Sequence, residues 1–348
     1  MNAITDTSTL QPLARAASVP LPMQAIVRTE YGAADVLRLG EIERPTIAEN
    51  EVLVRVHAAG LDRGTWHLMT GRPYLMRLFG FGLRRPKNPV LGLDVAGTVV
   101  AIGAAVTRFK VGDEVFGIGQ GSFAECARAR EDKLARKPNN LTFEQAAVLG
   151  VSALTALQSV RDAAKVEADQ RVLILGASGG VGSYAVQIAK ALGAHVTGVC
   201  SAAKMHLVRS IGADQVIDYA HEDFADGSER YDVILDIAGN SPLSRLRRAM
   251  TPSGTVVFVG GEHGGELTGG LGRPIRAMFL SMFVRQKFVM FMAKEHHADL
   301  ERLAQLVDAG KVSPIIDQSY PLQQVPEAMR QLVAGRVRGK VVISVVPG

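Results

Sequence analysis

The sequence predicts an α/β protein with two domains. Its 348 residues are enough for about two hydrophobic cores. Glycine is frequent, with 36 residues, and aromatic residues make up only 5% of the chain. A composition rich in Val, Ile, Leu and Ala is typical of short buried parallel strands that alternate with helices. The third observation is a change of pattern near residue 141, from strand-like segments to alternating strands and helices.

The charge pattern argues against nucleic acid as a primary partner. The net charge is +5, but acidic residues are interspersed throughout, which indicates a mildly basic surface. The densest basic segments, residues 84–87 and 245–248, contain no aromatic residues on which bases would stack. We therefore expect a small-molecule ligand.

The cysteine count and the apolar segments predict a cytoplasmic protein. Cys126 and Cys200 are the only cysteines, so we expect a reducing compartment. Residues 1–22 lack the continuous apolar run of a secretory signal and are predicted to be a flexible extension. The apolar stretch 277–292 contains two cations and is too short to span a membrane.

The first half of the chain has the pattern of a β-barrel. Strands are predicted at Gln24–Arg28, Glu51–Ala58 and Gly92–Ile102, each bounded by Gly, Pro or charged turns. Residues 112–115 and 121–125 are predicted to be connections between strands. Short strands with such turns indicate a compact barrel-like domain.

The second half has the pattern of parallel βαβ units. Thr142 is a predicted N-cap, and residues 144–160 form a predicted helix. Strands are then expected at 171–175, 195–200, 231–237 and 255–259, and helices at 181–192, 204–211 and 244–250.

Beyond residue 259 the pattern becomes less regular. The Gly-rich stretch 260–272 precedes predicted helices at 300–308 and 326–333 and a strand at 340–345. This last part is too small to fold alone, so we expect it to return to the first domain. The predicted division is an extension at 1–22, the first part of the barrel domain at 23–145, a dinucleotide-binding domain at 146–288 and the return at 289–348.

A glycine-rich loop predicts the nucleotide site. The strand 171–175 runs directly into Gly176-Ala177-Ser178-Gly179-Gly180-Val181-Gly182 and then into a helix. This context is the one that a dinucleotide-binding loop requires. The backbone N–H groups and the helix dipole attract a pyrophosphate. We assign Gly176, Ser178, Gly179, Gly180, Val181 and Gly182 to the cofactor site.

The end of the second strand of this unit predicts NADPH as the cofactor. A carboxylate at this position would accept the ribose 2′-OH of NAD, but the sequence there is Val199-Cys200-Ser201. Ser201 can donate a hydrogen bond to a 2′-phosphate, and Lys204 can neutralise its charge.

The chain resembles the medium-chain dehydrogenase/reductase superfamily, on its zinc-free quinone oxidoreductase, or zeta-crystallin-like, side. The resemblance covers residues 23 to the C-terminus and is carried by residues 89–99, 176–182, 217–219 and 338–342. It implies a Rossmann doubly wound parallel sheet plus a GroES-like β-barrel catalytic domain, which the C-terminal segment completes.

The resemblance also implies further cofactor contacts. Tyr219 is expected near the adenosine 2′-phosphate and Thr155 near the nicotinamide, with Val259 and Lys340 completing the site. Two alternatives stay open: Tyr219 as a half-buried aromatic at a strand end, and Thr155 as a helix hydroxyl bonded to its own backbone.

No metal site is predicted. Zinc alcohol dehydrogenases of the superfamily use a Cys and a His-Glu pair where this chain has Leu61-Asp62 and Leu93-Asp94, and these residues do not form a tetrahedral site. Asp94 is expected to anchor the local backbone. Asp62 and His67 are the catalytic candidates, because zinc-free relatives place an Asn and a Tyr on this segment. The alternative is an Asp62 N-cap followed by a packed His67.

Without a Lewis acid, the hydride acceptor must itself tolerate negative charge, as a quinone, an enone or a related carbonyl compound does. The alternatives are a zinc-independent NAD(P)-dependent alcohol dehydrogenase and a non-catalytic NADPH-binding protein, because lens zeta-crystallins, which this chain resembles, have structural or RNA-binding roles. A homodimer is expected from the resemblance, through the strand 255–259 and the apolar stretch after it.

Overall fold

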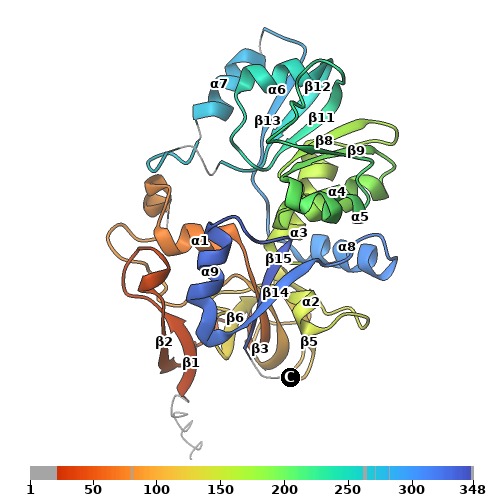
Figure 1. The fold of residues 1–348 in the computed structure, drawn as a ribbon. Helices are drawn as coiled ribbons and strands as arrows, with labels where there is room; N and C mark the ends of the chain where they lie inside the picture. The colour runs from red at the N-terminus through yellow and green to blue at the C-terminus, as the bar shows by residue number, and fades with distance from the viewer. Residues whose placement is uncertain (1–21, 80, 262–264, 271, 282, 346–348) are drawn as a thin grey trace, which may run out of the picture.

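Two β-sheets organise the part of the chain that the structure describes. The computed structural model describes residues 22–79, 81–261, 265–270, 272–281 and 283–345. The predicted extension, residues 1–22, lies outside these ranges apart from Pro22, which begins the first strand. In Figure 1 one sheet forms the upper half of the molecule and the other forms the lower half.

The upper sheet is the predicted doubly wound sheet. Its strands are all parallel, in the order β10-β9-β8-β11-β12-β13. Numbered from β8, this order is 3-2-1-4-5-6, the order of dinucleotide-binding folds. The strands are β8 Arg171–Leu175, β9 His195–Cys200, β10 Gln215–Asp218, β11 Tyr231–Asp236, β12 Met250–Phe258 and β13 Lys287–Met290.

Helices cover both faces of this sheet, so its strands are apolar at consecutive positions. Val172 and Ile174 pack into one core and Leu173 and Leu175 into another. The first core includes residues of α3 Val151–Gln158, α4 Gly180–Ala191, α5 Met205–Ser210 and α8 His297–Asp308; the second includes residues of α6 Leu243–Ala249 and α7 Gly272–Ser281.

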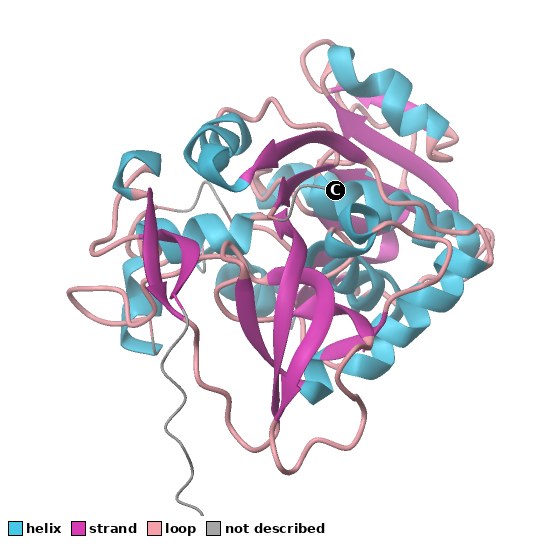
Figure 2. Ribbon diagram, turned by 90° about the horizontal axis from the view of Figure 1, so that it is seen from below, coloured by secondary structure: helices cyan, strands magenta, loops and turns pink. Residues whose placement is uncertain are grey.

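The lower sheet has the order β14-β15-β3-β4-β5-β7, and β6 also pairs with β3. The C-terminal strand β15 lies antiparallel to β3, so the end of the chain is part of the first sheet in sequence. Figure 2 shows these strands from below, with the β1–β2 pair standing to their left. The strands of this sheet are β3 Glu51–Leu61, β4 Asp94–Ile102, β5 Glu114–Ile118, β6 Cys126–Arg130, β7 Leu134–Arg136, β14 Ile316–Pro321 and β15 Lys340–Ser344. β1 Pro22–Val27 and β2 Arg38–Glu43 form a separate two-stranded sheet.

Three further helices accompany the lower sheet: α1 Arg63–Thr70, α2 Phe143–Ala147 and α9 Val325–Val333. The predicted Thr142 N-cap is confirmed, because its side chain accepts a hydrogen bond from the backbone N–H of Gln145. Together, the two sheets confirm the predicted α/β class, with a Rossmann-like sheet and a barrel-like sheet. The domain boundaries stay predictions.

The stretch predicted to be helical at 144–160 is helical with one interruption. The chain forms α2 and α3 with a break at residues 148–150, and a π-helical turn follows at Ser159–Ala163. The break has a tertiary cause, because the N–H of Val151 donates to the carboxylate of Asp94 at 2.6 Å. A Cβ on Gly150 would lie 2.3 Å from that carboxylate, so only glycine fits at the break.

The region after residue 259 is more regular than the sequence indicates. It contains α7 and then β13, which pairs with β12. The strand predicted at 255–259 is therefore not a sheet edge, because β12 has neighbours on both sides. The edge is β13. No helix in the described ranges is long and apolar enough to cross a membrane.

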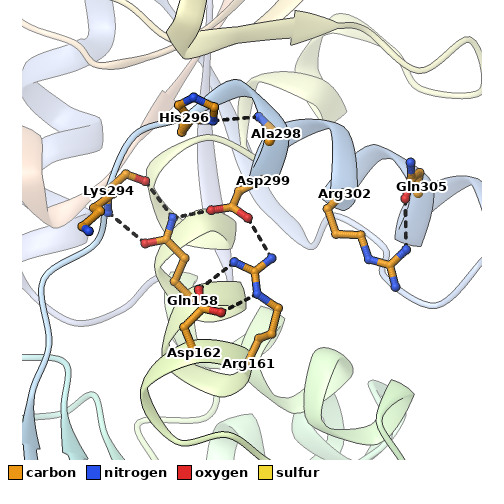
Figure 3. A network of polar contacts seen from close by, with 9 residues as sticks. All are labelled: Gln158, Arg161, Asp162, Lys294, His296, Ala298, Asp299, Arg302 and Gln305. Carbon is orange, nitrogen blue, oxygen red and sulfur yellow. Dashed lines mark hydrogen bonds and ion pairs between the residues drawn. The ribbon is translucent and has the colours of Figure 1, made fainter.

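A polar network joins α3 to the beginning of α8 (Figure 3). The buried amide of Gln158 donates to the carbonyl of Lys294 and to the carboxylate of Asp299, both at 2.7 Å, and accepts from the N–H of Lys294 at 2.8 Å. Arg161 pairs with the other oxygen of Asp299 at 2.7 Å. These contacts fix the chain where it leaves β13.

We predict that Gln158→Leu lowers the free energy of unfolding by about 1–3 kcal/mol, because the backbone groups of Lys294 lose their partners. Urea denaturation measures the change. Gln305→Ala, an exposed position of α8, is the control and changes stability by at most about 0.5 kcal/mol. Equal stability of Gln158→Leu and the wild type contradicts the structural role of Gln158.

Candidate active site

The glycine-rich loop between β8 and α4 can hold an anion. Gly176 has a φ of 86°, in the left-handed region that favours glycine. A Cβ on Gly182 would lie 2.1 Å from the carbonyl oxygen of Gly176, so the loop closes against the helix only with glycine. Gly179 occupies the N-cap without a side-chain cap. The first N–H groups of α4 thus stay available for a ligand phosphate.

This loop borders a cleft of about 520 Å³. The cleft lies beyond the carboxyl ends of β8 and β11, where the strand order reverses and where ligands bind in open α/β sheets. It brings together many residues that are far apart in sequence. The predicted residues in its wall are Asp62, His67, Thr155, Gly176, Ser178, Gly179, Gly180, Val181, Lys204, Val259 and Lys340.

Three predicted cofactor residues lie outside this wall. Gly182 is packed beneath the loop. Ser201 and Tyr219 follow the carboxyl ends of the neighbouring strands β9 and β10, and Tyr219 is 63% exposed. These two residues therefore lie beyond the carboxyl ends of the strands, on the side of the sheet where the cleft opens.

Sequence analysis missed the part of the wall that follows β11. Ile237, Ala238 and Asn240 line the cleft there. The available signal was the position of β11 as the fourth strand, because the switch point of a doubly wound sheet lies between its first and fourth strands.

Lys204 is held at the edge of the cleft by two backbone carbonyls. Its Nζ donates to the oxygen of Gly335 at 2.8 Å and to that of Val337 at 2.7 Å. Burial lowers the pKa of the Lys204 ammonium. Because an ammonium group has three N–H donors, one donor is left for a ligand.

Lys340 is buried in the cleft wall and pairs with Asp94. Its Nζ lies 3.0 Å from Asp94 Oδ2 and 3.1 Å from the hydroxyl of Ser152. Burial raises the pKa of Asp94 to about 7, and the Lys340 cation opposes this shift. Asp94 also accepts from the N–H of Val151, as expected of a backbone anchor. The pair joins β4, β15 and α3 beneath the glycine-rich loop.

Thr155 lies on α3 above this pair. Its hydroxyl donates to the carbonyl of Val151 at 2.7 Å, which is the alternative considered from the sequence. Its side chain nevertheless lines the cleft. The same oxygen remains able to accept a hydrogen bond from a ligand, because a hydroxyl has two lone pairs.

Asp62 is the N-cap of α1, and it also faces the cleft. Its Oδ1 accepts from the N–H of Thr65 at 2.8 Å. Its Oδ2 is buried and has no hydrogen-bond partner among the described residues. Because an unpaired buried carboxylate oxygen is costly, this atom is suited to accept a hydrogen bond from a ligand hydroxyl.

His67 has a defined tautomer. Its Nδ1 lies 2.7 Å from the carbonyl oxygen of Arg72, and because a carbonyl oxygen can only accept, Nδ1 carries the proton. Nε2 therefore accepts hydrogen bonds in the neutral ring and donates only in the imidazolium. Trp66 packs edge-on against the imidazole, with ring centroids 4.8 Å apart.

Two arginines hold the helix that carries His67. Arg28 donates to the carbonyls of Leu68 and Met69, and Arg77 donates to those of Thr70 and Gly71. The last carbonyls of a helix have no partner within it, and cations near them also interact favourably with the helix dipole. The position of α1 is fixed as a result.

An apolar pocket of about 420 Å³ adjoins the cleft, and Gly64 and His67 line both. An acceptor in this pocket would lie beside a cofactor in the cleft, with His67 at the junction. Its other lining residues include Leu68, Pro73, Met76, Phe81 and Leu93.

The described residues contain no group of three His, Cys, Asp or Glu side chains that could hold a metal ion. Asp94, at one of the positions compared with zinc enzymes, is already bound to Lys340 and Val151. The adjacent histidines His296 and His297, which could offer nitrogen ligands to a metal, also have protein partners. His296 caps α8 and His297 pairs with Glu301. The described residues at these positions therefore do not supply the three protein ligands of a catalytic zinc ion.

Two family models match the chain. Residues 48–197 match the alcohol dehydrogenase GroES-like domain, and residues 211–343 match the model described as zinc-binding dehydrogenase. Together they span both sheets.

Similar proteins cover almost the whole chain. The mitochondrial NAD(P)H oxidoreductase RTN4IP1 of Mus musculus is 34% identical, over 93% of this chain and 89% of the relative. The chloroplastic NADPH-dependent alkenal/one oxidoreductase of Arabidopsis thaliana is 33% identical, over 95% and 82%. The quinone oxidoreductase structure from Coxiella burnetii superimposes with a TM-score of 0.83 at 27% identity, covering 94% of this chain and 100% of that one.

Proposed function

Because the chain belongs to the medium-chain dehydrogenase/reductase superfamily, among its quinone oxidoreductase-like members, we propose that it reduces quinones, enones or related carbonyl compounds with NADPH and without zinc. Relatives named as oxidoreductases identify it as an enzyme that uses a nicotinamide cofactor. The observation that carries the finer proposal is the shared wall: the glycine-rich loop and His67 border one cleft, and an apolar pocket adjoins it.

The cofactor site fits NADPH. When bound, the reduced nicotinamide supplies a hydride. The N–H groups at the start of α4 would hold the pyrophosphate, and Thr155 and Val259 would lie along the cleft toward the nicotinamide. Ser201, Lys204 and Tyr219 would meet the 2′-phosphate at the sheet edge. Lys340 would act from within the wall, through its contacts with Asp94 and Ser152.

His67 is the proposed proton donor. Reduction of a quinone or an enone requires one hydride and one proton, and the proton goes to the oxygen or carbon that has gained the electron pair. The imidazolium of His67 can give this proton from Nε2 while Nδ1–H stays bonded to Arg72. The neutral ring that remains takes up a proton from solvent before the next turnover.

The residues at the two positions compared with zinc enzymes support the proposed zinc independence. Asp94 already has a cation partner in Lys340, and Asp62 caps α1. Stabilisation of the developing oxyanion then depends on His67. The alternatives, a zinc-independent alcohol dehydrogenase and a non-catalytic NADPH-binding protein, differ from the proposal in their turnover with bound cofactor.

A homodimer and a cytoplasmic location belong to the proposal. Support for the dimer comes from the free edge of β13 and from the exposed side chains of Phe279, Phe283, Met290 and Met292 near it, and the native mass in solution measures it. Support for the location comes from two buried cysteines without a disulfide, and cell fractionation measures it.

We predict that chelator-treated protein oxidises NADPH in the presence of an ortho-quinone or an enal, and that a simple aldehyde is a poorer acceptor, because it does not delocalise the charge. Absorbance of the reduced cofactor measures turnover, and NADH is run in parallel. Loss of turnover that zinc restores contradicts zinc independence, and NADPH binding without turnover of any acceptor favours the non-catalytic alternative.

We predict that His67→Phe lowers kcat about 100-fold, the lower range for loss of a general acid, with the NADPH Kd nearly unchanged. Steady-state kinetics and cofactor fluorescence measure the two quantities. His195→Phe is the control, because His195 is the first residue of β9. It therefore lies at the amino ends of the parallel strands, whereas the cleft lies beyond their carboxyl ends. Equal turnover of His67→Phe and wild type removes His67 from the mechanism.

We predict that Lys204→Ala reduces the preference for NADPH over NADH about tenfold or more, because it removes a charge-assisted hydrogen bond to the 2′-phosphate. Lys204→Arg keeps the charge and is the matched control. The ratio of kcat/KM for the two cofactors measures the preference, and an unchanged ratio in Lys204→Ala assigns the lysine to its contacts with Gly335 and Val337 only.

A further inference from the structure

Two segments far apart in sequence meet beside the apolar pocket. Arg72–Leu75 follows α1, and Glu266–Leu267 precedes α7, the helix that packs against the upper sheet. In Figure 1 the light-blue segment before α7 reaches down to the orange segment beyond α1. The N–H of Tyr74 donates to the carbonyl of Glu266 at 2.8 Å, and that of Leu75 donates to Leu267 at 3.1 Å. We call this contact the clasp.

The side chain of Glu266 supplies the polar part of the clasp. Its Oε1 lies 2.9 Å from Arg72 Nη1, and its Oε2 accepts from the hydroxyl of Tyr74 at 3.0 Å. One carboxylate thus holds two residues of the opposite segment. Between them lies Pro73, whose ring packs so closely on Gly269 that a Cβ there would lie 2.6 Å from it.

The clasp leads directly to His67. The backbone carbonyl that accepts from His67 Nδ1 belongs to Arg72, the same residue whose guanidinium pairs with Glu266. The position of this carbonyl sets both the tautomer and the direction of the imidazole. Pro73 also lines the pocket into which His67 faces. The segment before α7 therefore contacts His67 through one intermediate residue, Arg72.

The exposure of the clasp indicates a role in geometry rather than in stability. The side chains of Arg72 and Glu266 are 43% and 55% exposed, and an ion pair this exposed to solvent contributes little to stability. Loss of such a pair leaves the fold intact. A proton donor is more sensitive, because small displacements of a catalytic group cost large factors in rate.

We propose that Glu266 is a positioning residue for proton transfer. By holding Arg72 and Tyr74, it fixes the carbonyl that orients His67, so that the donor is aligned only when the segment before α7 is seated against the segment after α1. The inference rests on the proposed function, in which His67 gives the proton.

The test is a double-mutant cycle of Glu266→Ala and His67→Phe, with kcat for an ortho-quinone and the NADPH Kd as readouts. In the wild-type background, Glu266→Ala lowers kcat about tenfold and leaves the Kd within about twofold. In the His67→Phe background it has no further effect, because the group that it positions is gone. Asp308→Ala, an exposed acid on α8, is the control for loss of a surface charge.

Two further variants separate orientation from local packing. Glu266→Gln keeps an acceptor for Tyr74 and loses the charge that holds Arg72, so its kcat falls between those of wild type and Glu266→Ala. The exchange Arg72→Glu with Glu266→Arg restores the pair in reverse and recovers kcat relative to either single change.

The inference is overturned if Glu266→Ala has wild-type kcat, or if it lowers kcat by the same factor in both backgrounds. Failure of the proposed function gives a different pattern. In that case His67→Phe itself has wild-type kcat, and any effect of Glu266→Ala then belongs to binding or packing at the pocket.

Discussion

The buried pair of Lys340 and Asp94 is the interaction on which the arrangement of the site depends. It joins the final strand of the chain to the start of β4, and Asp94 also receives the first N–H of α3. Cβ atoms on Gly60 or Gly150 would lie within 2.6 Å of this carboxylate. Only glycine at these two positions therefore lets the neighbouring segments pack against Asp94. Removal of one partner of such a pair leaves a buried charge without compensation. The glycine-rich loop lies next to this pair, since the carbonyl of Ser178 accepts from the N–H of Gly339, the neighbour of Lys340 in sequence.

The second fixed element is α1, which has a catalytic candidate at its start and another near its end. Asp62 both caps the helix and lines the cleft, and its second carboxylate oxygen is buried without a partner among the described residues. Arg28 and Arg77 hold the final carbonyls, and His67 is tied to Arg72 just beyond them. The two interpretations considered for Asp62 are therefore compatible, because different oxygens of one carboxylate serve them. A rigid first turn is what makes a ligand contact at this residue reproducible.

The cleft and the pocket divide the chemical tasks. Backbone N–H groups and Lys204 line the end that suits phosphates, whereas mainly aliphatic and aromatic side chains, together with Glu295, line the pocket beyond His67. A pocket with so few polar groups binds an acceptor by burial of apolar surface. In the proposed function, such a pocket would favour flat conjugated molecules and would leave their orientation to contacts with the cofactor and His67. The residues of the pocket come from α1, the segment after it, the loops near 93, 261 and 269, and the segment after β13, which supplies Glu295.

The sequence by itself determined the class of fold, the strands β8 and β9 to the residue, and the loop from Gly176 to Gly182, because these features depend on local periodicity and on glycine at a tight turn. It also identified Asp62 and His67 as the catalytic candidates. Tertiary structure decided the break between α2 and α3, because Asp94 lies 57 positions from Val151 and no local pattern records that contact. It decided that β13, rather than β12, is the edge strand on that side of the upper sheet, since strand order is a property of the assembled sheet. It also decided the tautomer of His67 and the partners of Lys340, because a hydrogen bond between segments depends on where packing places both ends.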